Sequence, residues 1–314
     1  MKKMISVILA LVMALSLCAF ASAEENTDSA LISLTVTSPS GAPALALSVL
    51  ADQYPANYTY IAADEIAAAF AKKEADFIVA PINAGAKLYK LGKSTYKLAA
   101  VVTWGNLFIA SQKADLKQED LNGASVVLFG ENTINASMVL YALEKNGIKP
   151  GDVSYLASAS ETQKLLLNDA DAIVVTAEPA LTAAKITAKK DEKAISSIAV
   201  NELLKQADGD DGYPQAGLFV KEDTLKKDPD AVKAFMAAAK EACESCSADA
   251  GKVAAIAEKL EILPNAKVAE AALPGCAIRF MAAKEAKELI EKTVAVDPAQ
   301  FGGEVPADDF YYGE

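Results

Sequence analysis

The sequence contains no histidine and a single arginine, Arg279, among its 314 residues. Without an imidazole, the chain lacks the usual general base at neutral pH and the commonest metal ligand, so a Ser-His-Asp triad is excluded. The composition therefore disfavours hydrolases and metalloenzymes. We expect no catalytic residues, no cofactor and no bound metal.

Positive charge is also scarce. Lysine and arginine together number 30, against 42 aspartates and glutamates, which gives a formal net charge of −12. Nucleic acids and anionic membrane surfaces attract basic proteins through their phosphate groups. The charge balance therefore argues against nucleic acid or an anionic membrane surface as a partner.

Four cysteines are present, and one of them, Cys18, lies in an N-terminal apolar segment. Cys243 and Cys246 continue the apolar stripe of a helix predicted from Pro229, which indicates buried core thiols. A disulfide from either of them to Cys276 is the alternative. A redox C-x-x-C pair belongs at a strand-to-helix junction, and three cysteines without histidine make a poor zinc site.

The first 23 residues have the pattern of a secretory signal. Lys2 and Lys3 precede an apolar core at 4–17, and the small residues at 21–23 predict cleavage after Ala23. A lipid anchor at Cys18 is the alternative, but the residue before it, Leu17, is bulky where such signals need a small one. We expect a secreted protein, in the periplasm or at the cell surface, with no other segment apolar enough to span a bilayer.

A strand, a loop and a helix follow this segment. Alternating residues predict a strand at Leu31–Val36, and the Ala- and Leu-rich residues 44–54 predict a helix. In the loop between them, Ser40 or Gly41 is placed to cap the helix, and Pro43 suits its first turn. The first N–H groups of a helix are unpaired and attract an acceptor or an anion. A plain turn is the alternative.

The same arrangement returns along the chain. The apolar run 76–80 predicts a strand buried on both faces, which leads into Pro81, Ile82 and Asn83. Other strands are predicted at 58–61, 97–102, 107–110, 125–128, 153–156, 171–175, 195–200 and 216–220, with helices between most of them and almost only helices from 222 onward. Such alternation predicts an α/β fold with mostly parallel sheets flanked by helices.

Two short apolar strands bracket the middle series of strands and helices. They predict two passages between lobes, at hinge strands 107–111 and 215–220. We therefore expect lobe I at 24–106 and 221–314, lobe II at 112–214, and a helical C-terminal region.

Several stretches resemble a known family. Residues 75–89 (ADFIVAPINAGAKLY), 120–127 (DLNGASVV), 217–222 (GLFVKE) and 229–235 (PDAVKAF) are similar to stretches of ABC-importer substrate-binding proteins of the nitrate, sulfonate and thiamine-precursor type. The resemblance implies a type II periplasmic-binding fold, capture of a small molecule between two lobes by hinge closure, and delivery to a membrane permease. We expect a monomer. An enzyme on the same fold, or a ligand-sensing module that docks on a membrane receptor, is the alternative.

The resemblance also implies which residues bind the ligand. They follow strand ends in both lobes, where open α/β sheets hold ligands, or lie at the passages between the lobes: Ser38, Pro39, Ser40, Gly41, Ala42, Pro81, Ile82, Asn83, Thr103, Trp104, Asn106, Asn132, Thr133, Asn135, Glu178, Tyr213 and Gln215.

Each of these residues has a plainer interpretation. Trp104 is equally suited to a core position, Asn132 or Thr133 to capping a helix, Glu178 to a solvated first turn, and Tyr213 to an exposed loop. Because no arginine or lysine falls in these loops, we favour a neutral or cationic ligand, with aromatic faces around it and Glu178 as a counter-charge.

Overall fold

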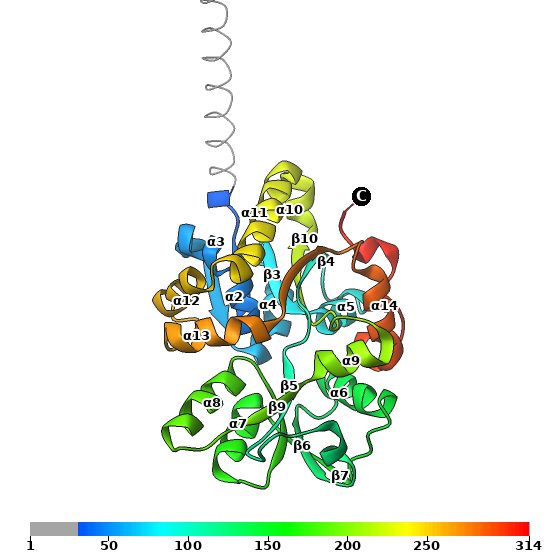
Figure 1. The fold of residues 1–314 in the computed structure, drawn as a ribbon. Coiled ribbons are helices and arrows are strands. Elements are labelled where there is room, and N and C mark those ends of the chain that lie inside the picture. Colours follow the sequence, from blue (N-terminus) through cyan, green and yellow to red (C-terminus); the bar gives the residue numbers. More distant parts are fainter. Residues whose placement is uncertain (1–30, 314) are drawn as a thin grey trace, which may run out of the picture.

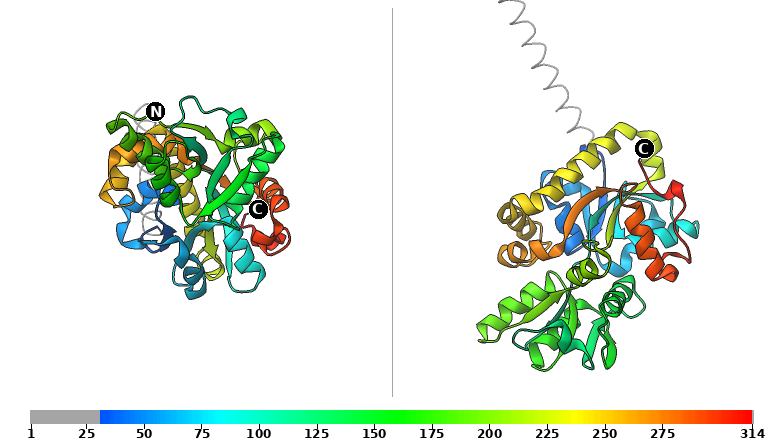
Figure 2. Two further views of the ribbon diagram at one scale, coloured as in Figure 1. Left: turned by 90° about the horizontal axis from the view of Figure 1, so that it is seen from below. Right: turned by 45° about the vertical axis from the view of Figure 1, so that its right-hand side comes forward.

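The computed structural model describes residues 31–313, so the predicted signal segment and Cys18 lie outside the described residues. Figure 1 shows two bodies, one above the other, each built around a sheet with helices packed against it. The views in Figure 2 agree that the bodies join near the middle of the molecule. No helix among residues 31–313 is long and apolar enough to cross a membrane.

The upper body, called the first half, contains a six-stranded sheet in the order β11-β4-β10-β3-β1-β2. β1 pairs in parallel with β2 and β3, whereas β10 and β11 pair antiparallel with their neighbours. β10 lies between β3 and β4, with Leu218 opposite both Val79 and Ala100. The strands are β1 (Val36–Pro39), β2 (Tyr58–Ile61), β3 (Phe77–Pro81), β4 (Tyr96–Thr103), β10 (Ala216–Lys221) and β11 (Ile278–Ala282).

The lower body, called the second half, contains a five-stranded sheet in the order β7-β6-β8-β5-β9. β6 pairs in parallel with β7 and β8, and β5 pairs antiparallel with β8 and β9. The strands are β5 (Leu107–Ser111), β6 (Ser125–Phe129), β7 (Asp152–Leu156), β8 (Ile173–Ala177) and β9 (Ser196–Ala199).

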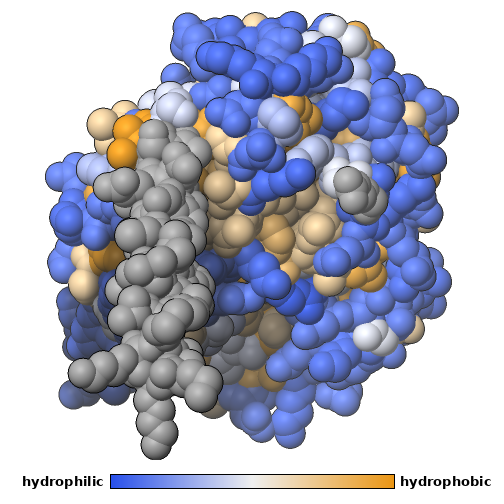
Figure 3. Space-filling model, turned by 90° about the horizontal axis from the view of Figure 1, so that it is seen from above, coloured by the Kyte–Doolittle hydropathy of each residue, from blue (hydrophilic) through white to orange (hydrophobic). Residues whose placement is uncertain are grey.

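Helices cover both sheets, and the predicted α/β class with a helical C-terminal region is confirmed. They are α2 (Ala42–Ala46), α3 (Ser48–Gln53), α4 (Ile66–Lys72), α5 (Ile82–Lys90), α6 (Ile134–Lys145), α7 (Ala159–Asn168), α8 (Ala180–Lys190), α9 (Val200–Asp208), α10 (Glu222–Lys227), α11 (Pro229–Ala248), α12 (Ala250–Lys259), α13 (Ala266–Ala272) and α14 (Lys287–Val296). Hydrophilic residues cover most of the first half seen from above (Figure 3).

The hydrophobic core runs through both halves. One cluster of buried residues includes Phe219 of the six-stranded sheet and Val175 of the five-stranded sheet. Cys243, Cys246 and Cys276 are buried free thiols that pack among apolar side chains, so the core-thiol interpretation is confirmed and the disulfide alternative is wrong. Burial raises the pKa of all three thiols, that of Cys246 to about 12.

The predicted strand at Leu31–Val36 is wrong over most of its length. Residues 31 and 32 are helical, and the strand begins at Val36. The reason lies in Thr35, whose backbone N–H and hydroxyl donate to the carboxylate of Asp76 at 3.0 and 2.8 Å. A side chain therefore satisfies the N–H group that a neighbouring strand would otherwise bind.

The two strands predicted as hinges belong to the sheets themselves. β5 lies between β8 and β9, and β10 lies between β3 and β4. The chain therefore passes between the sheets at residues 104–106 and, after α9, at 209–215. The division into two lobes at the predicted boundaries stays a proposal.

Candidate functional site

Polar side chains converge where the two passages cross between the halves. The amide nitrogen of Gln215 lies 3.0 Å from Asn106 Oδ1, 3.3 Å from Asn135 Oδ1 and 3.4 Å from the hydroxyl oxygen of Tyr213. The Tyr213 hydroxyl in turn donates to Asn135 Oδ1 at 2.7 Å. Thr103 donates weakly to Gln215 Oε1 at 3.5 Å. These five predicted residues, called the polar cluster, join both passages to the start of α6.

Tyr213 is 2% exposed, so its interpretation as an exposed loop residue is wrong. Burial raises the pKa of its hydroxyl far above the usual value, which keeps the hydroxyl protonated and able to donate to Asn135. Asn106 is also buried, and its amide donates to the backbone oxygen of Glu178 at 2.7 Å. The polar cluster is thus a fixed hydrogen-bonded frame in the core between the sheets.

Loops of the first half reach the same place. Because β1 and β3 are parallel neighbours, Ser40 and Gly41 follow one strand at the edge where Pro81 and Ile82 follow the other. The N–H of Ile82 donates to the backbone oxygen of Gln215 at 3.0 Å, which ties this edge to the polar cluster. Ser40 and Pro81 are exposed, Gly41 is half-buried, and Ser38, Pro39, Ala42 and Ile82 are buried.

Asn83 carries the clearest sign of a missing partner. It lies in the first turn of α5, and its Oδ1 atom is buried without a hydrogen-bond donor. A buried carbonyl oxygen without a donor costs free energy, so an unpaired one at a strand end marks a place for a ligand or a water molecule.

Trp104 is a core residue and does not present a free face. It is 1% exposed, its indole nitrogen donates to the backbone oxygen of Arg279 at 2.7 Å, and the Arg279 guanidinium stacks on the ring with its central carbon 4.2 Å from the ring centroid. Sequence reasoning missed this pairing because β11, which carries Arg279, was assigned to a helical region. Arg279 thus lies beside one of these loops, and a lack of arginine no longer favours a neutral or cationic ligand.

Each half contains a mixed sheet, the chain passes twice between the halves, and polar residues lie at the strand ends. The family model described as NMT1/THI5 like matches residues 68–251, more than half of the chain. The chain belongs to the NMT1/THI5-like family. A search of curated proteins finds no match.

Solved structures share the fold of this NMT1/THI5-like protein. An ABC transporter protein from Parabacteroides distasonis has a TM-score of 0.76 at 21% identity, over 90% of this chain and 99% of its own. The periplasmic aliphatic sulphonate binding protein SsuA of Escherichia coli has a TM-score of 0.65 at 14% identity, over 90% and 92%. A zinc-bound ligand-binding component of an ABC-type import system from Staphylococcus aureus has 0.65 at 14%, over 89% and 96%. The expected type II periplasmic-binding fold is confirmed.

Two predicted residues of the NMT1/THI5-like chain lie at the start of α6 but outside the polar cluster. Thr133 caps the helix, with its hydroxyl oxygen 3.4 Å from the N–H of Ala136, so its capping interpretation is confirmed. Asn132 has a left-handed backbone, with φ of 58°, and an exposed side chain. Its backbone oxygen accepts from Gln300 of the first half at 2.8 Å. Asn132 therefore joins the halves through its main chain.

Glu178 lies where the two halves of the protein are in close contact. Its carboxylate accepts from the N–H and the hydroxyl of Thr182 at 3.0 and 2.9 Å and is 7% exposed, so it is not a solvated residue. Burial raises the pKa of this carboxyl, while the bonds from Thr182 oppose the rise. A Cβ atom on Gly275 would lie 2.8 Å from Glu178 Cγ, which shows how tightly the segment after α13 packs here.

Among residues 31–313, no three Cys, Asp or Glu side chains are grouped so that they could hold a metal ion. The acceptors and donors of the polar cluster are amides and hydroxyls. Such groups bind and orient a polar molecule.

Proposed function

We propose that the chain is an extracytoplasmic solute-binding protein that captures a small organic molecule between two lobes and delivers it to an ABC permease. The observation that carries this proposal is the polar cluster, in which Gln215 from one passage meets Asn106 from the other and Asn135 from α6. Residues from both lobes thus meet around one point, as a ligand held by closure requires.

The unused polar atoms suggest what the ligand presents. Asn83 Oδ1 is buried without a donor, and the amide nitrogen of Asn135 has no acceptor among residues 31–313. A molecule with one N–H or O–H donor and one acceptor would satisfy both. We therefore propose that the ligand is a neutral polar compound held beside the loops 38–42 and 81–83. In this proposal Glu178 packs against Gly275 at the contact between the halves and does not serve as a counter-charge.

Closure of the lobes has a physical basis in the contacts between the halves. On one side Ser137 of α6 donates to Asp297, after α14, at 2.7 Å, and Gln300 donates to the backbone of Asn132. On the other side α8 packs against α13, near Glu178 and Gly275. Few polar contacts hold these surfaces together, so the lobes can separate by rotation at residues 104–106 and 209–215.

The proposed setting follows from the family and from the neighbours' described roles. ABC import components and a periplasmic binding protein share this fold. We propose secretion after cleavage behind Ala23, a monomeric state and docking on a membrane permease. Family membership and the fold support a binding role.

The test starts from the purified mature protein, because such proteins often keep their ligand. Native mass spectrometry identifies a retained molecule, and calorimetry with that molecule measures its affinity. Binding should raise the melting temperature by mass action and lower the radius of gyration in X-ray scattering. A ligand that binds without any change in radius would contradict capture by closure, and recovery of a chemically altered ligand would favour the enzyme alternative.

A further inference from the structure

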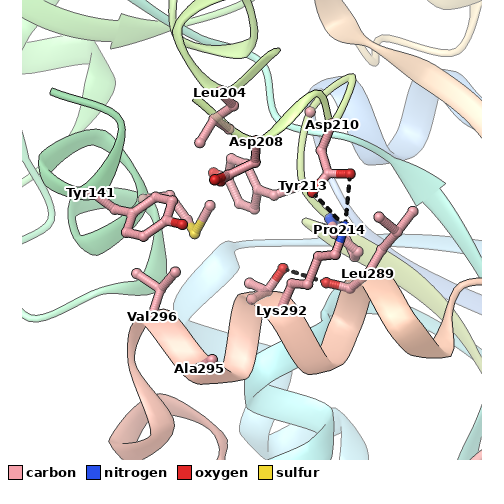
Figure 4. Close-up of a pocket in the computed structure, with 13 residues that line it drawn as sticks. Tyr141, Leu204, Asp208, Asp210, Tyr213, Pro214, Leu289, Lys292, Ala295 and Val296 are labelled. Atoms are coloured by element: carbon pink, nitrogen blue, oxygen red, sulfur yellow. Dashed lines mark hydrogen bonds and ion pairs between the residues drawn. The ribbon is translucent and has the colours of Figure 1, made fainter. Parts of the chain in front are cut away.

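A cavity lies beside the passage at residues 209–215. Its volume is about 340 Å³, and it is a half-open cleft bounded by α6, by α9 with the loop that follows, and by α14. Figure 4 shows Tyr141 of α6 facing Val296 of α14 across this space, with Asp208 and Leu204 above them. Ligand pockets usually begin at about 300 Å³, so the cavity is large enough for a small organic molecule.

This cavity differs from the proposed ligand site. Of the residues predicted to bind ligand, only Tyr213 lines it. The ring of Tyr213 forms part of the wall, while its hydroxyl group donates to Asn135 in the polar cluster. The two sites are therefore neighbours that share one aromatic side chain.

The charged groups in the wall favour a cation. They are the carboxylates of Asp208 and Asp210 and the ammonium group of Lys292, which leaves one negative charge in excess. Lys292 Nζ lies 3.1 Å from both oxygens of Asp210 (Figure 4), so the wall already holds an ammonium group. The Lys292 side chain is half-exposed, and that of Asp210 is 23% exposed. Burial and then the neighbouring Asp208 carboxylate raise the pKa of the Tyr141 hydroxyl.

Apolar groups make up much of the remaining wall, among them Met138, Leu204, Leu289 and Val296. An apolar lining with one carboxylate not paired to a cation suits a compound with a charged end and a hydrocarbon or aromatic body. We propose that this cavity binds a small protonated amine with an apolar body, whose ammonium group bonds to Asp208 while the body packs between α6 and α14.

A molecule bound in this cavity affects the proposed closure of the lobes. α6 belongs to the second half and α14 to the first, and an occupant contacts both helices. Bound amine therefore favours the present spacing of the halves over a more open one. This consequence rests on the proposed function, whereas amine binding itself does not.

The test uses phenethylamine as the probe, with 2-phenylethanol and 3-phenylpropionate as neutral and anionic compounds of similar shape. Binding to the full mature chain is followed by NMR chemical shifts at millimolar concentrations, with no ligand added to the other site. Phenethylamine should bind saturably, the alcohol roughly tenfold more weakly, since a charge-assisted hydrogen bond is lost, and the acid not measurably.

Three variants separate this assignment from a nonspecific apolar contact. Asp208→Asn should weaken phenethylamine roughly tenfold, and Lys292→Met should strengthen it, because the competing ammonium group is removed from Asp210. Ala295→Trp, at an exposed position in the wall, should block binding by filling the space. Thermal unfolding of each variant confirms that it is folded.

Equal affinity for the amine and the alcohol, or unchanged amine affinity in folded Asp208→Asn, would overturn the assignment. Because the probe is tested without ligand in the other site, such a result leaves solute capture by the polar cluster standing. Conversely, if the protein is found not to capture a solute between its lobes, the amine titration still tests this cavity by itself.

Discussion

Replacing Gly275 with alanine should hinder closure of the two halves. Gly275 lies in the 3₁₀ helix Leu273–Cys276, at the surface that meets the second half. A Cβ atom there would lie 2.8 Å from Glu178 Cγ, 3.2 Å from Glu178 Oε1 and 3.2 Å from Phe108 Cζ. Gly275 does not have a positive φ, so alanine introduces no backbone strain within its own half.

The size of the effect follows from how firmly Glu178 is held. Its carboxylate accepts two hydrogen bonds from Thr182, so the side chain moves aside only by losing them. Overpacking of this kind costs about 1–3 kcal/mol. If that cost applies only to the closed arrangement, ligand affinity falls by roughly 5- to 150-fold. Calorimetry measures the affinity, and X-ray scattering with ligand should show a larger radius of gyration.

Gly251→Ala is the matched control. Gly251 lies in α12, and a Cβ atom there has only Glu270 Oε1 nearby, at 3.8 Å. Alanine at this position should leave ligand affinity unchanged and raise the free energy of unfolding by up to about 1 kcal/mol, since it is the better helix former. If Gly275→Ala binds ligand with wild-type affinity and shows the same radius of gyration, the halves do not close on this contact and our reasoning is wrong.

Three further predictions concern buried polar groups. Asn83→Ala should lower ligand affinity roughly two- to tenfold. The unfolding temperature should stay at or above that of the wild type, because Asn83 Oδ1 has no hydrogen-bond donor to lose. A lower unfolding temperature would show that this oxygen is paired in the native protein. Burial raises the pKa of Glu178 above its usual 4.5, so this carboxyl contributes stability below pH 4.5 that is lost as the pH rises through the folded-state pKa. Glu178→Gln should flatten that part of the curve of melting temperature against pH, and an unchanged curve would count against the shift. Cys243, Cys246 and Cys276 should resist a thiol reagent at pH 8 until the protein unfolds, and rapid labelling of the native protein would show that these thiols are accessible.

Local sequence patterns predicted most elements of the fold well. The strand at Tyr58–Ile61 was placed correctly to the residue, because a β-rich run identifies it. The polar cluster was also within reach, since Asn106 and Gln215 border strands and Asn135 lies in the first turn of α6, where the chain changes direction. Their mutual hydrogen bonds depend on the packing of the two halves, which no local pattern describes.

Tertiary contacts account for the failures. Leu31–Thr35 alternates as a strand does, but Asp76, 41 residues away from Thr35, takes its N–H group. β11 was missed because Ile278–Ala282 is short and lies between helices, and it becomes a strand only by pairing with β4. The same omission concealed Arg279, whose position over Trp104 follows from that pairing.

The place of β10 between β3 and β4 sets an order on folding. During synthesis from the N-terminus, β3 cannot complete its ladders until residue 221 is available, and β4 also needs β11 at Ile278–Ala282. All strands of the second sheet, in contrast, lie within residues 107–199. The second half is thus a continuous unit able to fold early, while the first half remains an open sheet with unpaired edges until β10 and then β11 arrive. Nascent chains halted before residue 216 should therefore aggregate through these edges and bind chaperones, and chains extended beyond residue 282 should not.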